Sequence, residues 1–238
     1  MRALVHERSE VNKGFLTPFD FERLNAFLKP LIRMGPNQCF MLSPPFSSMG
    51  FYEAIATALR SRAVAAGENS YVDASIGASI EPTLAEAFTQ HKINPSAVSR
   101  KYGVFECDIV LESPSTIFLI ETKKKSLTRQ AQAGHTLQAF ADLIAGVFDS
   151  QLQLGRHELQ LRSHGRIEFE DGTCVSWNNR RIFRLAVTLL DWGGTQDRVV
   201  LRELARHLIG ARINAPLDTP AEFRNTLVNM RWDSQLEY

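Results

Sequence analysis

The pattern of apolar and polar residues changes period along the chain: it has helical spacing before residue 100, and strand and helical spacing take turns after it. Thr17-Pro18 places a capping hydroxyl before a proline at the first helical position, and Pro30 ends that segment. A second segment, rich in Ala, Leu and Arg, stops at Gly67, a residue suited to a left-handed helix cap. The signals predict helices over 18–29, 49–66 and 82–90, a turn-rich stretch over 42–48, and a loop or short strand over 68–79.

Two apolar, β-branched runs, Tyr102–Leu111 and Thr116–Thr122, flank a Glu-Ser-Pro-Ser turn and predict a β-hairpin. Asp171-Gly172 marks a second hairpin. This order of elements indicates an α/β fold in which helices flank a mixed β-sheet. The remaining predicted elements are a long helix over 126–154 directly after the first hairpin, strands over 166–170, 173–177 and 181–190, and helices over 198–209 and 220–232.

Composition narrows the class of protein but not its partner. Apolar residues make up 44% and charged residues 22%, as in folded globular proteins, and the net charge of +1 neither requires nor excludes nucleic acid. Cys39, Cys107 and Cys174 form no C-x-x-C pair, which argues against a disulfide framework or a zinc site and fits a reducing cytoplasm. No apolar run approaches the ~20 residues of a membrane span, and the first residues do not resemble an export signal.

Charged residues interrupt the first hairpin where a buried strand should be apolar. Glu106 and Asp108 share one face of their strand, and Glu121 and Lys123 point together from the neighbouring strand. Two carboxylates with a main-chain carbonyl, that of Thr122, supply half of the oxygen shell that Mg²⁺ prefers. A lysine beside a metal-bound water can orient or deprotonate it, or offset charge on a phosphorane, so phosphodiester hydrolysis is the reaction that fits.

These residues resemble the PD-(D/E)xK, or restriction-endonuclease-like, nuclease superfamily, and most closely its Mrr-like and nuclease-related branches. The chain reads Glu106-Cys107-Asp108 and, on the next strand, Ile120-Glu121-Thr122-Lys123, with Cys107 where the proline of the motif stands. The resemblance covers about residues 80 to 150. It implies that Asp108 and Glu121 hold the metal, that Lys123 is the catalytic lysine, and that Glu81 is the helical glutamate. Residues 80–238 would then form the nuclease-like core, and residues 1–79 a helical extension packed on it.

Two glutamates compete for the position on the helix. Glu86 lies three residues after Thr83 and fits a capping box, whereas Glu81 precedes Pro82 and at a helix start can face the hairpin. The sequence favours Glu81 and leaves the choice open.

Basic and amide side chains follow the hairpin immediately. Lys124 and Lys125 adjoin the proposed metal site, and Arg129 and Gln132 come next. As a nucleic-acid interface these four would contact phosphates, which gives affinity without sequence information. As an ordinary surface, basic residues would face solvent.

The expected function is therefore a Mg²⁺- or Mn²⁺-dependent deoxyribonuclease of the cytoplasm, which the resemblance associates with endonucleases of restriction, repair or defence. Many such proteins act as dimers, since two sites cut two strands, and a homodimer stays open. A non-catalytic nucleic-acid-binding or interaction module on the same fold is the alternative. RNA is a further substrate that the sequence does not exclude.

Overall fold

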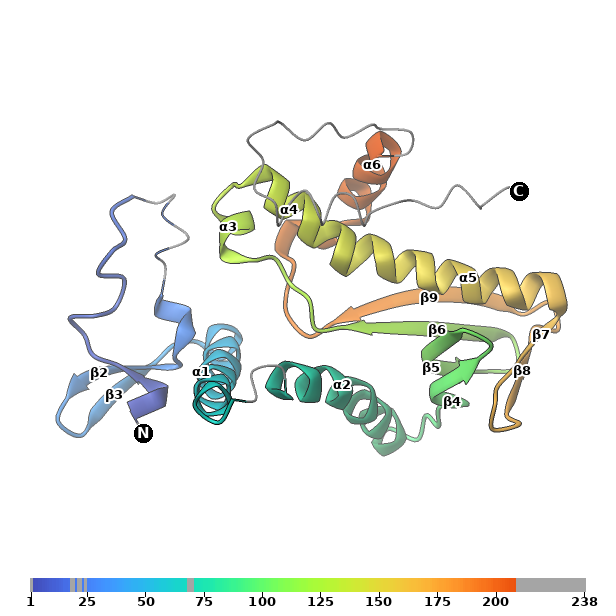
Figure 1. Ribbon diagram of the computed structural model, residues 1–238, viewed down its shortest axis with the longest axis horizontal. Coiled ribbons are helices and arrows are strands. Elements are labelled where there is room, and N and C mark those ends of the chain that lie inside the picture. The colour runs from blue at the N-terminus through green and yellow to red at the C-terminus, as the bar shows by residue number, and fades with distance from the viewer. Residues whose placement is uncertain (1, 18–19, 21–22, 24, 68–70, 209–238) are drawn as a thin grey trace.

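A four-stranded mixed sheet forms the centre of residues 71–208 (Figure 1). The computed structural model describes residues 2–17, 20, 23, 25–67 and 71–208. The strand order is β4-β5-β6-β9, with antiparallel pairing of β4 with β5 and of β5 with β6, and parallel pairing of β6 with β9. The predicted α/β class with a mixed sheet is confirmed. The strands are β4 (Ala97–Tyr102), β5 (Phe105–Glu112), β6 (Thr116–Lys123) and β9 (Arg181–Thr188).

Helices cover both faces of this sheet, α2 (Tyr71–Gln90) on one and α5 (Asp149–His164) on the other (Figure 1). Neighbouring side chains of a strand point to opposite faces, so the uninterrupted apolar run of β6 supplies a core on each side. The principal residues are, toward α5, Leu119, Leu154 and Leu161, and toward α2, Ile109, Ile120 and the half-buried Leu84 and Phe88.

The first predicted hairpin is confirmed, with one boundary moved. β5 and β6 pair in register over Ile109–Glu112 and Ile117–Ile120. The first predicted strand, however, contains a turn at its start, because Gly103 takes φ +54° and Tyr102 belongs to β4, which folds back on β5. Glycine tolerates a positive φ because it has no Cβ. Apolar neighbours hide this turn in the sequence pattern.

Helix α2 begins at Tyr71, well before the predicted helix start at Pro82. The expectation of a loop or short strand over 68–79 is therefore wrong for the described residues 71–79. Apolar residues at every fourth position give α2 one continuous stripe that passes the proline. Proline removes one backbone donor, and the Thr83 hydroxyl donates to the Ser79 carbonyl at 2.7 Å within the same turn. The stripe consists of Val72, Ile76, Ile80, Leu84 and Phe88.

The helical extension expected over residues 1–79 also contains, within its described residues, a separate sheet of three short strands. β1 (Val5–His6) pairs parallel with β2 (Leu31–Gly35), and β2 pairs antiparallel with β3 (Gln38–Met41). The helix predicted over 18–29 lies partly outside the described residues, and within it the 3₁₀ turn η3 (Ala26–Leu28) replaces an α-helix. A further 3₁₀ turn, η1 (Arg2–Leu4), precedes β1.

Helix α1 (Pro44–Ala65) begins earlier than predicted. The expected turn over 42–48 is wrong, since a helix tolerates prolines in its first turn, where their missing N–H groups have no helical partner. Gly50 lets α1 cross the chain closely, because an added Cβ would lie 2.8 Å from the Pro30 nitrogen. Gly67 takes φ +78° after the helix, as its capping role predicts. Helix α2 then runs through the expected boundary between residues 79 and 80.

The prediction of a single helix over 126–154 is wrong. The segment begins with a loop and then forms several shorter helices. Gly134, with φ +93°, separates the first two helices, and a π-helical turn joins the second to α5. Helix α5 passes Gly155, the predicted end, and stops at Gly165 in the left-handed conformation. At the π-turn, an added Cβ on Gly146 would lie 2.2 Å from the buried Trp192 ring. The pieces are α3 (Arg129–Gln132), α4 (Thr136–Leu143), the π-turn η4 (Ile144–Phe148) and α5.

The C-terminal predictions hold as far as the description extends. The second hairpin forms, and Gly172 at its tip takes φ +85°. The helix predicted over 220–232 lies outside the described residues. No described helix is long and apolar enough to span a membrane. The remaining elements are β7 (Arg166–Glu168), β8 (Cys174–Ser176), the 3₁₀ turn η5 (Gly193–Gln196) and α6 (Arg198–Leu208).

Candidate active site

A polar cavity of about 400 Å³ opens at the end of the β5–β6 hairpin that lies away from its turn. The four side chains predicted to be catalytic, those of Glu81, Asp108, Glu121 and Lys123, all line it. The structure thus brings together residues from α2, β5 and β6. The other lining residues are Val104, Phe105, Glu106, Thr122, Gln153, Arg156 and His157.

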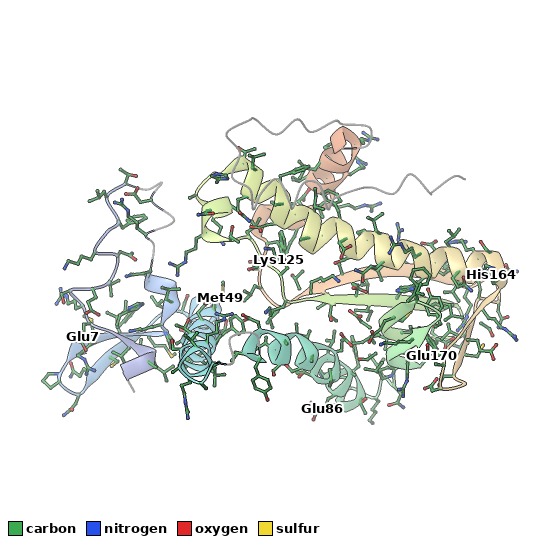
Figure 2. The ribbon with its side chains drawn as sticks, in the orientation of Figure 1. Glu7, Met49, Glu86, Lys125, His164 and Glu170 are labelled. Carbon is green, nitrogen blue, oxygen red and sulfur yellow. The ribbon has the colours of Figure 1, made fainter. Side chains whose placement is uncertain are left out.

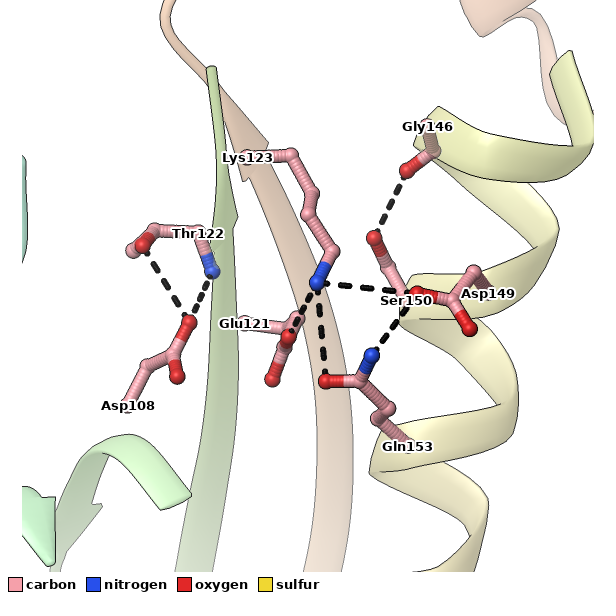
Figure 3. A network of polar contacts seen from close by, with 8 residues as sticks. All are labelled: Asp108, Glu121, Thr122, Lys123, Gly146, Asp149, Ser150 and Gln153. Atoms are coloured by element: carbon pink, nitrogen blue, oxygen red, sulfur yellow. Dashed lines mark hydrogen bonds and ion pairs between the residues drawn. The ribbon is translucent and has the colours of Figure 1, made fainter. Parts of the chain in front are cut away.

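The cavity exists because the regular pairing of β5 and β6 ends at Ile109 opposite Ile120. At the next position the Asp108 side chain takes the place of a backbone acceptor: its Oδ2 accepts hydrogen bonds from the Thr122 amide at 2.7 Å and the Thr122 hydroxyl at 3.2 Å. Asp108 Oδ1 makes neither of these bonds (Figure 3). A carboxylate is therefore held at the point where the two strands separate.

Glu121 is the most deeply buried charged group of the cavity, with 2% of its surface exposed. Its Oε1 accepts a hydrogen bond from Lys123 Nζ at 2.7 Å, and its Oε2 is buried without a hydrogen-bond partner among the described residues. Burial raises the pKa of Glu121 to about 7, and the neighbouring Asp108 charge adds to the rise, against the pull of the lysine. The unpaired oxygen marks a position where a further cation or proton would be stabilised.

Lys123 is held from its own strand and from α5 (Figure 3). Its Nζ donates to Gln153 Oε1 at 3.5 Å and lies 3.7 Å from Asp149 Oδ2, while Gln153 Nε2 donates to Asp149 Oδ2 at 2.7 Å. Burial disfavours the charged form, but the hydrogen bond to Glu121 and the nearby carboxylates raise the pKa of Lys123. The side chain is an ammonium group in this setting and donates protons in hydrogen bonds.

Asp149 and Gln153 are site residues that the sequence analysis missed. They are four residues apart on α5, and such residues share a helix face. That spacing was the available signal, but the helix start at Asp149 was not predicted.

Glu81 was expected at a helix start because it precedes Pro82. In the structure it lies in the middle of α2. Its Oε2 accepts a hydrogen bond from the Ser99 hydroxyl, and Ser99 itself has a strained backbone with φ +50°. Burial raises the pKa of Glu81; the Ser99 hydrogen bond opposes this, and the charge on Asp108 adds to it. Glu86 is exposed and points away from the sheet (Figure 2), so of the two candidate glutamates Glu81 faces the cavity.

The four residues predicted to bind nucleic acid do not line the cavity. Lys124 Nζ pairs with Asp73 Oδ1 at 2.7 Å, and Lys125 Nζ pairs with the fully buried Asp142 at 2.7 Å. Lys125 lies on the loop that leads from β6 into α3 (Figure 2). Both lysines thus tie the chain after β6 to neighbouring helices. The other two residues are Arg129, which is exposed, and Gln132, whose Nε2 donates to the Leu127 carbonyl at 3.2 Å.

His157 and Tyr102 form a buried pair behind the cavity. The Tyr102 hydroxyl and His157 Nδ1 are 2.5 Å apart, and the two rings meet edge to face with centroids 5.5 Å apart. Burial lowers the pKa of His157 to about 4, partly offset by the Glu106 carbonyl, so the ring is neutral at pH 7. This histidine supports the wall of the cavity and carries no charge into it.

The balance of charge in the cavity favours a cation. Four carboxylates, from Glu81, Glu106, Asp108 and Glu121, face two cationic groups, Lys123 and Arg156. Among the described residues, no three His, Cys, Asp or Glu side chains form a ready-made metal cluster. Two carboxylates, a main-chain carbonyl and waters are nevertheless a donor set that Mg²⁺ accepts, because this ion keeps several waters.

Comparisons of the chain with protein-family models, with curated proteins and with solved structures found no match. The chemistry of the cavity is therefore argued from its own residues. Together the fold and the cavity define an α/β protein with an acidic site, one half-buried lysine and an open side.

Proposed function

We propose that this protein is a divalent-metal-dependent nuclease that hydrolyses DNA phosphodiester bonds, built on a restriction-endonuclease-like fold. The observation that carries the proposal is the meeting of Asp108, Glu121 and Lys123 with Glu81 in one cavity. Carboxylates that hold a divalent cation, beside a fixed ammonium group, are suited to stabilising a negatively charged phosphoryl transition state. The PD-(D/E)xK pattern of the same residues supports this assignment. By that resemblance, restriction, repair or defence is the expected biological setting.

The donor atoms suit a hard cation such as Mg²⁺ or Mn²⁺. Asp108 and Glu121 would hold it with the main-chain carbonyl of Thr122, and Glu81 would complete the acidic wall. The buried, unpartnered Oε2 of Glu121 fits this role, because a bound cation would satisfy it. When bound, such a cation lowers the pKa of a coordinated water and polarises the phosphate.

The residues of the chain itself have separate tasks. Lys123 offsets negative charge that develops on the phosphate, since its raised pKa keeps it protonated. Asp149 and Gln153 hold its ammonium group over the cavity and so limit the motion of a long side chain. Thr122, through its amide and hydroxyl, fixes the orientation of the Asp108 carboxylate.

The direct test is cleavage of plasmid, linear duplex and single-stranded DNA, and of RNA, with Mg²⁺, Mn²⁺ or EDTA. Asp108→Asn and Lys123→Met each remove one charge from the cavity, and Glu86→Gln and Lys92→Met are matched controls on exposed residues. We expect metal-dependent cutting of DNA by the wild type and by both controls, and loss of cutting in both cavity variants. Binding of DNA without cutting under every condition would instead indicate a non-catalytic binding module, and cutting of RNA alone would make the protein a ribonuclease.

A further inference from the structure

Part of the cavity lining is apolar and exposed, in contrast to the charged residues that line the rest of it. Val104 forms the tip of the β4–β5 hairpin with Gly103, and Phe105 is the first residue of β5 and pairs with Tyr102. Of their surfaces, 91% is exposed for Val104 and 38% for Phe105. The other two tight hairpin turns of this part of the chain carry polar tips, Ser113-Pro114-Ser115 and Asp171-Gly172. Hairpin tips facing solvent are ordinarily polar, so an apolar tip at the mouth of a polar cavity points to a ligand with an apolar surface.

The Phe105 ring is held in place from behind. Its centroid is 5.6 Å from that of Tyr102, which is itself fixed by His157. The Arg156 guanidinium of α5 lies over the Phe105 ring, 6.0 Å from its centroid, so a base that stacks on this face takes the place of the guanidinium. Arg156 is exposed and forms no ion pair with any described residue, unlike Lys124 and Lys125. An aromatic ring beside an unpaired guanidinium is the combination that proteins use to stack an unpaired base and hold its phosphate.

We infer that Val104, Phe105 and Arg156 form a binding wall for one unpaired nucleotide: the base stacks on Phe105, and Arg156 contacts a phosphate adjoining the scissile one. This inference rests on the proposed function and names its substrate class, single-stranded DNA or a frayed end. A cavity of about 400 Å³ lies at the small end of the range that holds small ligands. It accommodates one nucleotide, whereas a stacked duplex would have to stay outside the charged wall.

The test measures binding separately from cleavage. Fluorescence anisotropy with a labelled single-stranded oligonucleotide, in EDTA and in Ca²⁺, gives the affinity. An oligonucleotide carrying 5-iododeoxyuridine, irradiated in the complex, reports which side chain lies against the base. We expect a crosslink at Phe105 and a loss of affinity of about 5- to 150-fold in Phe105→Leu, the range for removing one base–aromatic stack.

Three further variants make the result specific. Phe105→Trp keeps a stacking surface and is expected to retain binding. Arg156→Gln is expected to weaken binding of single strands and to make the slope of log K against log[salt] shallower by about 0.7, because one phosphate contact is lost. Phe183→Leu is the matched control: this ring is exposed on β9 and does not line the cavity. Equal thermal unfolding of the variants excludes a folding defect.

The outcomes separate this inference from the proposed function. Cleavage of duplex and single strands at equal rates, with Phe105→Leu unchanged in both, overturns the binding wall and leaves the nuclease in place. A crosslink at Phe105 without cleavage in any metal supports the wall and removes the nuclease. Crosslinking elsewhere, with full affinity in Phe105→Leu, contradicts the wall whatever the activity.

Discussion

The two ends of the β5–β6 hairpin differ in how their polar groups are satisfied. At the turn end the ladder is regular over Ile109–Glu112, and Arg180 closes it by donating to the Ser113 carbonyl at 3.0 Å and to the Glu112 carboxylate. At the open end the ladder stops, a side chain replaces a backbone acceptor, and Glu121 keeps a buried oxygen without a partner among the described residues. Both ends belong to the same two strands.

This difference indicates what each end is for. Buried polar groups that are fully paired, packed among apolar side chains, stabilise a fold. A carboxylate that is buried with incomplete pairing costs stability, and such groups gather at functional sites. We therefore infer that the turn end supports the structure, and that the open end, where the proposed metal site lies, is kept at some expense of stability. Substitutions at the two ends should accordingly affect different measurements.

The largest effect should come from Lys123→Met. Loss of one preorganised charge that stabilises a transition state lowers rates by about 10²–10³-fold, or roughly 3–4 kcal/mol. Removing one partner of a buried pair also costs stability, about 3–5 kcal/mol where the remaining charge stays buried. The loss should be smaller here, because Glu121, whose pKa is raised to about 7, can take up a proton. Single-turnover cleavage and urea unfolding measure the two quantities. A large loss of stability with normal cleavage would show that Lys123 and the open end of the hairpin serve the structure and not the chemistry.

In the regularly paired part of the hairpin, Leu119→Ala should do the opposite. The side chain is 1% exposed and packs in the core under α5, so its truncation should lower the free energy of unfolding by about 3 kcal/mol. Cleavage by the remaining folded protein, measured well below the unfolding temperature, should stay within about twofold. An unchanged free energy of unfolding would show that the paired part of the hairpin does not stabilise the fold.

The buried His157 should make stability fall in acid. Its pKa of about 4 in the fold lies below the ordinary value of 6.5, so the unfolded chain binds a proton first as pH drops. The neutral ring contributes fully above pH 6.5, and about 3 kcal/mol is lost between pH 6.5 and 4. His157→Gln, compared with the exposed His91→Gln by urea unfolding at pH 7 and pH 4.5, should lack this part of the slope. An equal loss of unfolding free energy between pH 7 and pH 4.5 in wild type and His157→Gln would contradict this role of His157.

Glu121 should have a smaller effect, of opposite sign, in metal-free protein. Its pKa is raised to about 7, so the protonated form is favoured by folding; this contribution is complete below the ordinary value of 4.5 and is lost as pH rises through 7. Glu121→Gln should therefore gain stability relative to wild type between pH 5 and 8 in EDTA, on the order of 2 kcal/mol. Glu106→Gln, a more exposed carboxylate of the same cavity, is the control. A variant that loses stability at pH 8 would show that the ion pair with Lys123 outweighs burial.

The parts of the structure that could be predicted share one property: a sequence pattern only a few residues long indicates each of them. The hairpins at 102–122 and 166–177 follow from apolar runs and turn residues, and the acidic residues and lysine stand out because they interrupt such runs. The interactions that were missed join segments that are distant in sequence. Lys123 of β6 donates to Gln153 of α5, and a loop and two helices separate them along the chain. Ser99 of β4 donates to Glu81 of α2. No local pattern specifies such contacts.

The errors in secondary structure have similar causes. Pro82 was interpreted as a helix start because its local effect is strong, yet the apolar stripe of α2 outweighs one missing donor. The strand β3 (Gln38–Met41) has every residue exposed and so shows no alternation that a pattern could detect. The ion pairs of Lys124 and Lys125 were not predicted, because their acidic partners, Asp73 and Asp142, lie far away in sequence.

The central claim is that the open end of the hairpin binds a divalent cation through Asp108 and Glu121. Calorimetric titration with Mn²⁺, in the presence of an uncleavable phosphorothioate oligonucleotide, tests it most directly. We predict binding by the wild type and by Glu86→Gln, and at least tenfold weaker binding by Asp108→Asn and Glu121→Gln. Equal Mn²⁺ affinity in wild type and Asp108→Asn, or no binding by the folded wild type, would contradict the account.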